Sequence, residues 1–370
     1  MAIARTPIEA ERLSEAARKA LASGPIKMMA ARGLAPLPNP VDLITVLYQL
    51  AIDADGAVAQ AAAKTATELP DRVLTGALSN PQADPRVLDF FAERLANREA
   101  MLELILLNPA TADETVAELA GAVGERLVDL IASNEQRLLR HPAIIAAMYV
   151  NRAARMSTVD RAVELAVRNQ VRVPGIAAWD EIARAAVATA KAGPPSDEGR
   201  DAADALFAAA AEQAAEEADD DRAAAADEGD ERDLPLSAMT IPMKIRLATL
   251  GNKFVRAQLV RDSNKMVALA AIKAPGVTEM EAVKHAGNSA LSEEVIAYIA
   301  RKREWTKLYA CKLALVNNPK TPLAIAMRLV PHLRDKDIRA LARSKSIPSA
   351  LAAQARKLVM TRSTGGRGGR

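Results

Sequence analysis

The stretch LVNNPKTPLAIAMRLV, residues 315–330, shows how this chain ends one helix and starts another. Pro319 has no backbone N–H and its ring clashes with the preceding turn, so it cannot continue a helix. It also keeps Asn318 out of the helical conformation. Thr321 then offers a side-chain oxygen to free amides, and Pro322 suits the first position of a new helix. The stretch therefore predicts a compact break between two helices.

The residues after this break have the spacing of one helix face. Leu323, Met327 and Val330 stand at positions i, i+4 and i+7. Similar breaks recur along the chain at Asn80-Pro81, Pro85, Asn108-Pro109, Pro275, Ser292 and Pro348. Two threonine–glutamate pairs have capping-box spacing, Thr111 with Glu114 and Thr278 with Glu281.

Segments of about 10–15 residues with helical periodicity lie between these breaks, within the usual length of globular helices. No strand or hairpin pattern interrupts them. Short helices joined by tight turns predict an all-α fold in which each helix pair buries its second apolar face on the next pair. We expect two α-solenoid-like helical repeat domains, at residues 36–191 and 236–360.

The charge of the chain changes abruptly between these two domains. Residues 196–233 hold 15 acidic and 3 basic residues, whereas residues 234–370 hold 25 basic and 8 acidic ones. Like charges at that density repel, and few large side chains are available for burial. We therefore expect a disordered, acidic Ala/Asp/Glu-rich linker at residues 192–235 and a basic second domain.

The two ends of the chain complete the predicted organisation. Residues 1–35 are expected to form an N-terminal helix and an extended lead-in, and residues 361–370 a disordered Gly/Arg tail. No apolar run is long enough to span a membrane, and no charged-apolar-small leader opens the chain. The sequence therefore predicts a cytoplasmic protein without membrane insertion.

Residues that carry catalytic chemistry are few and isolated. His141, His285 and His332 lack the neighbours that zinc binding or catalysis requires, and Cys311 is the only cysteine and lies on an apolar helix face. No phosphate-binding glycine loop occurs. We expect no catalytic residue, no metal site, no cofactor and no enzymatic activity.

The second domain contains a cluster of basic residues around Trp305 and Tyr309. Its members are Arg301, Lys302, Arg303, Lys307 and Lys312. Together with the Gly/Arg tail, this pattern is compatible with a nucleic-acid-binding surface. The simpler interpretation is that the two aromatic rings pack into the core and the charges lie on a solvated helix face.

Arg137 and Arg140 lie in the arginine-rich stretch 134–171 of the first domain. One interpretation is a groove for acidic peptides. The alternative, which we favour from the sequence, is that these arginines cover the helix surface and donate hydrogen bonds between repeats.

The sequence Asn-Pro-x-Thr-Pro followed by a leucine-type helix resembles the repeat of leucine-rich repeat variant proteins, and more loosely HEAT-type helical repeats. The matching residues are Asn318, Pro319, Thr321 and Pro322, with a partial match at Asn108, Pro109 and Thr111. The spacing departs from a strict period, and the cysteine-rich iron–sulfur module of one member of that family has no counterpart. The resemblance implies a fold class and no catalytic residue.

These patterns favour a non-enzymatic protein-binding scaffold or regulatory adaptor whose partners are other, acidic proteins. The alternative is a nucleic-acid-binding protein that acts through residues 236–370. A further hypothesis is that the acidic linker docks on the basic domain of its own chain, where tethering gives it a high effective concentration. Removing residues 196–233 would then strengthen partner binding at low salt.

Overall fold

The structure, a computed structural model, describes residues 3–22, 24–176, 179–192, 239–344 and 346–365, with isolated positions between 201 and 236. Every regular element in this part of the chain is a helix, and these residues form no strand. The all-α prediction is confirmed for them. Most of the expected acidic linker, and residues 366–370 of the expected Gly/Arg tail, lie outside the described residues.

The chain divides into two compact units, residues 1–187 (unit 1) and 188–370 (unit 2). The helices of unit 1 are α1 (Glu15–Leu21), α2 (Gly24–Ala31), α3 (Pro40–Ala51), α4 (Gly56–Glu68), α5 (Asp71–Leu78), α6 (Pro85–Arg94), α7 (Glu99–Leu107), α8 (Asp113–Ala120), α9 (Glu125–Ala132), α10 (Glu135–Arg140), α11 (Ala143–Val150) and α12 (Met156–Arg168), with the 3-10 turn η1 (Ala10–Arg12). Helix α13 (Trp179–Ala192) spans the boundary between the units in sequence.

Unit 2 is built from a second series of short helices. They are α15 (Ile241–Leu250), α16 (Lys253–Leu259), α17 (Lys265–Lys273), α18 (Glu279–Ala286), α19 (Glu293–Arg301), α20 (Arg303–Lys307), α21 (Tyr309–Asn317), α22 (Leu323–Leu329), α23 (Asp335–Arg343) and α24 (Ser349–Gly365), with the 3-10 turn η3 (Val330–His332). Helix α24 extends to Gly365, so residues 361–365 are helical and not part of a disordered tail as expected.

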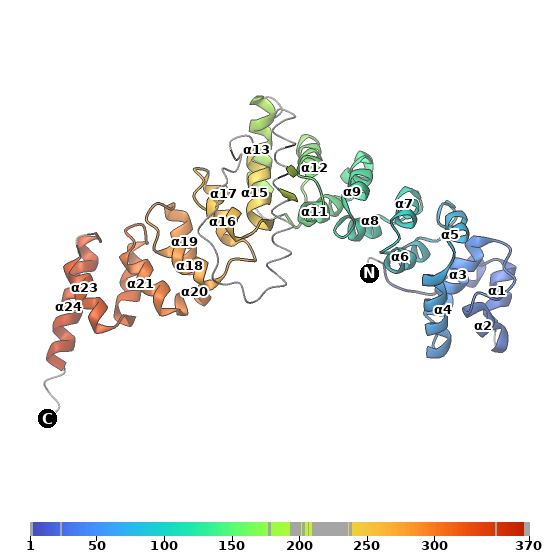
Figure 1. Cartoon of the computed structure of the whole chain (residues 1–370), viewed down its shortest axis with the longest axis horizontal. Helices are drawn as coiled ribbons and strands as arrows, with labels where there is room; N and C mark the ends of the chain where they lie inside the picture. The colour runs from blue at the N-terminus through green and yellow to red at the C-terminus, as the bar shows by residue number, and fades with distance from the viewer. Residues whose placement is uncertain are drawn as a thin grey trace. The chain divides into compact units, whose positions relative to one another are not determined.

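Within each unit, helices contact a helix two or three positions further along as well as their neighbours in the chain. In unit 1, α3, α5, α7 and α9 form one row, and α4, α6, α8 and α11 form another (Figure 1). In unit 2, α15, α17 and α19 follow one another in the same way. Each row therefore buries the apolar faces that a single helix pair would leave exposed.

Buried asparagines tie successive parts of each unit together. The side-chain Nδ2 of Asn318 donates to the carbonyl oxygens of Ala286, at 2.8 Å, and Asn288, at 3.2 Å. Its Oδ1 accepts from the backbone N–H of Lys320 at 3.0 Å. The same pattern recurs at Asn108 with Leu78, Asn80 and Ala110, and at Asn151 with Ala120, Val123 and Ala153.

The break at residues 318–322 exists, but two of its residues act differently from the prediction. Helix α22 begins at Leu323, with Pro322 as its N-cap and no side-chain cap. Thr321 does not cap this helix, because its hydroxyl is buried and donates to the carbonyl oxygen of Leu315 at 2.6 Å. That carbonyl lies at the C-terminal end of the preceding helix, where acceptors lack a partner within the helix.

The capping predictions have mixed outcomes. Thr278 and Glu281 form the predicted capping box, and Ser292 accepts from the N–H of Val295 at 3.4 Å. The capping box predicted at Thr111 and Glu114 is wrong. The N-cap of α8 is Ala112, and the Thr111 hydroxyl instead donates to the carbonyl oxygen of Ile105 at 2.5 Å.

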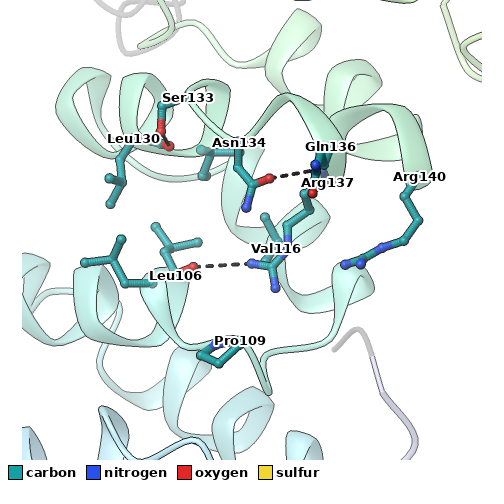
Figure 2. A pocket seen from close by; sticks show the side chains of 11 residues that line it. Leu106, Pro109, Val116, Leu130, Ser133, Asn134, Gln136, Arg137 and Arg140 are labelled. Carbon is teal, nitrogen blue, oxygen red and sulfur yellow. Dashed lines mark hydrogen bonds between the residues drawn. The ribbon is translucent and has the colours of Figure 1, made fainter.

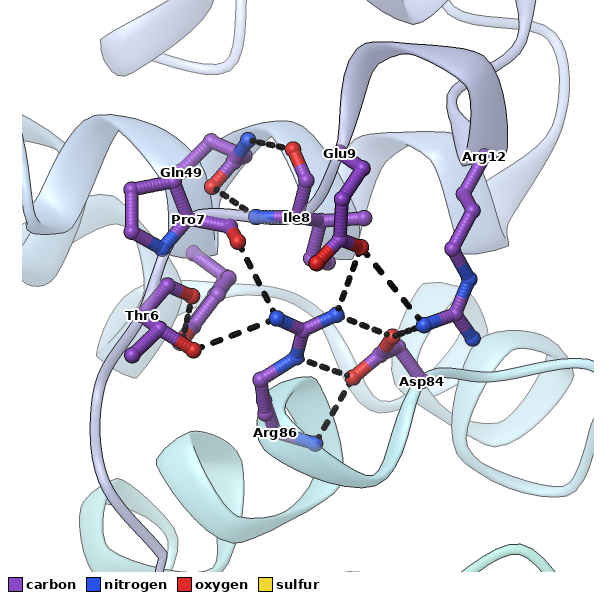
Figure 3. A network of polar contacts seen from close by, with 9 residues as sticks. Thr6, Pro7, Ile8, Glu9, Arg12, Gln49, Asp84 and Arg86 are labelled. Atoms are coloured by element: carbon purple, nitrogen blue, oxygen red, sulfur yellow. Dashed lines mark hydrogen bonds and ion pairs between the residues drawn. The ribbon is translucent and has the colours of Figure 1, made fainter.

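Residues 3–14 run along unit 1 with η1 as their only helical element, and α1 begins at Glu15. Arg86 on α6 holds this segment: its guanidinium donates to Thr6 Oγ1 at 3.2 Å and to the Pro7 carbonyl at 3.0 Å (Figure 3). Gln49 pairs with both backbone groups of Ile8 at 3.0 Å. These bonds hold the backbone of residues 6–8 against α3 and α6.

Candidate functional site

A cavity of about 320 Å³ opens on unit 1 where α7 and α9 end and α8 and α10 pack beside them. Figure 2 shows its lining side chains converging from these four helices and the turns between them. The residues that line it are Leu106, Leu107, Pro109, Val116, Leu130, Ile131, Ser133, Asn134, Gln136, Arg137 and Arg140. Its volume falls at the lower end of the range for ligand pockets in proteins.

One wall of this cavity is apolar because the last four residues of α7, Leu104–Leu107, are all apolar. The sequence of α7, EAMLELILL, leaves no polar face near its C-terminal end. Leu106 is buried, whereas Leu107 keeps 59% of its surface exposed beside the opening. Leu130 and Ile131 extend the apolar surface from the end of α9. A ligand that enters the cavity therefore meets aliphatic side chains on this side.

The other wall carries amide groups from the start of α10. Asn134 is the N-cap of α10, and its Oδ1 accepts from the backbone N–H of Arg137 at 3.1 Å. This bond directs the remaining Nδ2 of Asn134 as a hydrogen-bond donor beside the cavity. Gln136 is exposed on the same turn and adds a second side-chain amide.

Arg137, one of the predicted partner-binding residues, is buried and bonded to its own chain. Its guanidinium donates to the carbonyl oxygens of Leu106 at 3.3 Å and Thr111 at 3.0 Å. Its Nε lies 3.1 Å from Asp113. Burial lowers the pKa of Arg137, although an arginine stays charged in proteins. These bonds hold α10 against the end of α7 and the turn before α8.

Arg140, the second predicted residue in this unit, lies at the rim with 65% of its side chain exposed. Its Nε and Nη2 each lie 2.6 Å from an oxygen of Asp113, which fixes the plane of the guanidinium. The hydrogen bond from Arg140 holds the pKa of Asp113 below its ordinary value. Two guanidinium groups thus share one carboxylate, so this rim keeps a positive charge that faces solvent.

The predicted basic cluster of unit 2 lies on α19, α20 and α21. Arg301, Arg303 and Lys307 are exposed, and Lys302 and Lys312 are half-buried. The Nζ of Lys302 lies 4.1 Å from the centre of the Trp305 ring. Trp305 is only 3% exposed and packs edge-on against Tyr298, so its face is not open to a nucleotide base. This cluster can therefore contact a ligand through its charged groups and not through the Trp305 ring.

The isolated histidines and the cysteine occupy separate places. His141 follows α10, His332 lies in η3, and His285 is on α18. Burial lowers the pKa of His285 and raises that of Cys311 to about 11. Among the described residues, no group of histidine, cysteine and acidic side chains is arranged to hold a metal ion.

Sequence reasoning found the two arginines of the cavity and missed its other walls. Leu107 ends a run of four apolar residues, LILL, at the end of α7. A helix needs fewer apolar residues than this to cover one buried face, so the run indicates that an apolar side chain is exposed. Asn134 precedes Glu135 in the order typical of a helix N-cap, which would have placed its amide at a helix start. The closeness of α7 to α10 depends on packing and has no sequence signal.

Comparison with known proteins gives no match: no protein family, no curated protein and no solved structure is significantly similar to this chain. The resemblance of the Asn-Pro-x-Thr-Pro segment to leucine-rich repeat variant and HEAT-type repeats therefore stays a prediction. None of the described helices is long and apolar enough to cross a membrane.

Proposed function

We propose that this chain is a non-enzymatic protein-binding scaffold or regulatory adaptor, built as two α-solenoid-like units joined by an acidic linker. The observation that carries this proposal is the cavity between α7 and α10, which combines an aliphatic wall with a charged and amide-bearing rim. Concave sites of this kind bind ligands through apolar contact and use a few polar groups for orientation.

The ligand that fits this chemistry is a short acidic segment of another protein. An aliphatic side chain would enter between Leu107 and Leu130, while a carboxylate would approach the exposed guanidinium of Arg140. The amides of Asn134 and Gln136 can pair with the peptide backbone, because each carries both donor and acceptor capacity. Arg137 contributes by holding α10 against α7 and Thr111.

A selection of displayed random peptides on the immobilised full chain tests this function. We expect enriched peptides that place an aliphatic residue next to Asp or Glu. Arg140→Gln should weaken their binding about tenfold, since a hydrogen bond between charged groups contributes about 1.5–3 kcal/mol. Leu107→Asp should weaken it at least as much. Arg126→Gln is the matched control, because Arg126 is an exposed arginine of α9 that bonds to Glu99 and Glu103 instead.

The proposal fails if the selection enriches no peptide. It also fails if Arg140→Gln and Arg126→Gln change the affinity of the selected peptides equally. Circular dichroism of each variant establishes that the helices are intact before affinities are compared.

Nucleic-acid binding through unit 2 is the second candidate, favoured by its charge. The described residues 239–344 and 346–365 hold 22 basic and 8 acidic residues. Because Trp305 is buried, such binding would use phosphate contacts, and its affinity should fall steeply with salt. Titrating the full chain against labelled single- and double-stranded oligonucleotides at several salt concentrations tests it. No binding at low salt would exclude this candidate.

A further inference from the structure

Helix α15, the first helix of the row that begins unit 2, is buried on all sides. Met243, Ile245, Arg246, Leu247 and Ala248 are each buried. Residues 245–248 are consecutive, and they point in four directions around the helix axis because each residue turns the helix by about 100°. The first helix of a repeat stack ordinarily leaves its outer side to solvent or to a polar cap. Something must therefore cover the outer side of α15.

The residue that stands out on this helix is Arg246. It is only 1% exposed and is the largest fully buried side chain among the described residues. A buried guanidinium is costly unless it is held by partners that replace water. The ring of Phe207 supplies one such contact, with its centre 4.2 Å from the Arg246 Cζ. A cation above an aromatic face is stabilised most when both groups are shielded from solvent.

Phe207 comes from the acidic segment that separates the two predicted domains. Leu206 and Phe207 are the only large apolar residues between positions 196 and 233. Phe207 is nevertheless 3% exposed, as buried as a core residue. A segment with so few apolar residues gains little from burying one of them on itself, so this degree of burial indicates a dedicated site on unit 2.

We propose that Arg246 and the surrounding face of α15 form a recognition site for an aromatic residue flanked by carboxylates, and that Phe207 is the ligand built into the chain. The segment around Phe207, DAADALFAAA at residues 201–210, carries the matching chemistry: one aromatic ring preceded by two aspartates. A partner protein that presents a similar aromatic and acidic segment competes with Phe207 for this site. The site is thus closed by its own chain until such a partner displaces it.

A synthetic peptide that copies the segment provides the probe. Fluorescein-labelled peptide 197–212 is titrated against the full chain and against its Phe207→Ala variant, with fluorescence anisotropy as the readout. The peptide should bind Phe207→Ala at least about tenfold more tightly than the wild type, because the tethered Phe207 occupies the site at a high effective concentration. A peptide in which the phenylalanine is replaced by alanine should lose binding to Phe207→Ala.

Two further variants separate recognition from general electrostatic attraction. Phe254→Ala removes a partly exposed phenylalanine of α16 in the same unit and should bind the peptide as weakly as the wild type does. Phe207→Tyr keeps an aromatic face and should also exclude the peptide. Hydrogen exchange should be faster in residues 241–250 of Phe207→Ala than in the wild type, with α23 unchanged.

Three outcomes would overturn the proposal. The first is equal peptide affinity for the wild type and Phe207→Ala, and the second is no binding to either. The third is undiminished binding of the peptide that lacks its phenylalanine, which would show that charge alone attracts the segment. None of these outcomes depends on the cavity of unit 1, so they test this site independently of the proposed function.

Discussion

The side-chain amide of Asn318 donates a 2.8 Å hydrogen bond to the carbonyl oxygen of Ala286, 32 residues earlier in the chain. Asn108 and Asn151 make equivalent bonds to Leu78 and Ala120, 30 and 31 residues earlier. All three asparagines are buried. Each one satisfies a carbonyl at the end of an earlier helix, where the helix itself provides no donor. These bonds fix the spacing between successive parts of each unit.

Replacing Asn318 with alanine should destabilise unit 2. The change removes the donor to Ala286 and Asn288 and the acceptor for the N–H of Lys320, and unsatisfied buried groups cost about 1–3 kcal/mol. Urea unfolding followed by Trp305 fluorescence in a Trp179→Phe background measures the effect. Asn317→Ala is the matched control, because the exposed Asn317 bonds only to Leu313 in its own helix. Equal stability of the two variants would contradict this role.

Arg86→Met should release residues 3–9 from unit 1. Arg86 bonds to Thr6, Pro7 and Asp84, and bonds to charged groups contribute about 1.5–3 kcal/mol each. Backbone amides of residues 3–9 should exchange hydrogen faster in this variant. Arg72→Met, a change at an exposed arginine of α5, should leave their exchange at the wild-type rate.

Cys311 should resist thiol reagents while unit 2 is folded. Its side chain has no exposed surface, and burial raises its pKa to about 11, so little reactive thiolate exists at pH 8. We expect native labelling to be more than about a hundredfold slower than labelling in urea. The chain holds one cysteine, so one equivalent of reagent reports the opening of unit 2. Rapid native labelling would contradict the burial of α21.

The stability of unit 2 should fall as the pH drops from 7.5 to 5.5. Burial lowers the pKa of His285, with Arg261, Lys284 and Arg256 acting in the same direction and Glu281 opposing them. The unfolded chain then binds more protons than the folded one at pH values below about 6.5, so protonation favours unfolding. Urea midpoints of the wild type and His285→Gln measure this effect.

The variant should show a flatter pH dependence than the wild type. His332→Gln is the matched control, because His332 is an exposed histidine of the same unit. If His285→Gln retains the full decrease in stability between pH 7.5 and 5.5, another group is responsible.

Local chemistry explains which parts of the fold could be predicted from the sequence. Proline at position 319 excludes a continuous helix whatever surrounds it, so the break before α22 could be read directly. The hydrogen-bond partner of the Thr321 hydroxyl could not be predicted. A threonine at this position can either cap the following helix or donate to the carbonyl of Leu315 in the preceding one. The packing decides between these two bonds, because it buries Thr321 beside the carbonyl of Leu315.

The candidate site could be predicted only in part for the same reason. Arg137 and Arg140 stand out by residue type, yet one is buried in its own chain and the other lies at the rim. The three-residue spacing between them does not reveal which one turns inward. Contacts between residues about 30 positions apart, such as Arg137 with Leu106, arise from helix packing and leave no local pattern.

The most direct measurement is hydrogen exchange of the full chain with and without a peptide selected for binding. The account predicts slower exchange in residues 105–140, which form the cavity between α7 and α10, and unchanged exchange in residues 239–365. The protection should disappear in Arg140→Gln and persist in Arg126→Gln. Protection confined to unit 2, or no protection at saturating peptide, would contradict a protein-binding site in unit 1.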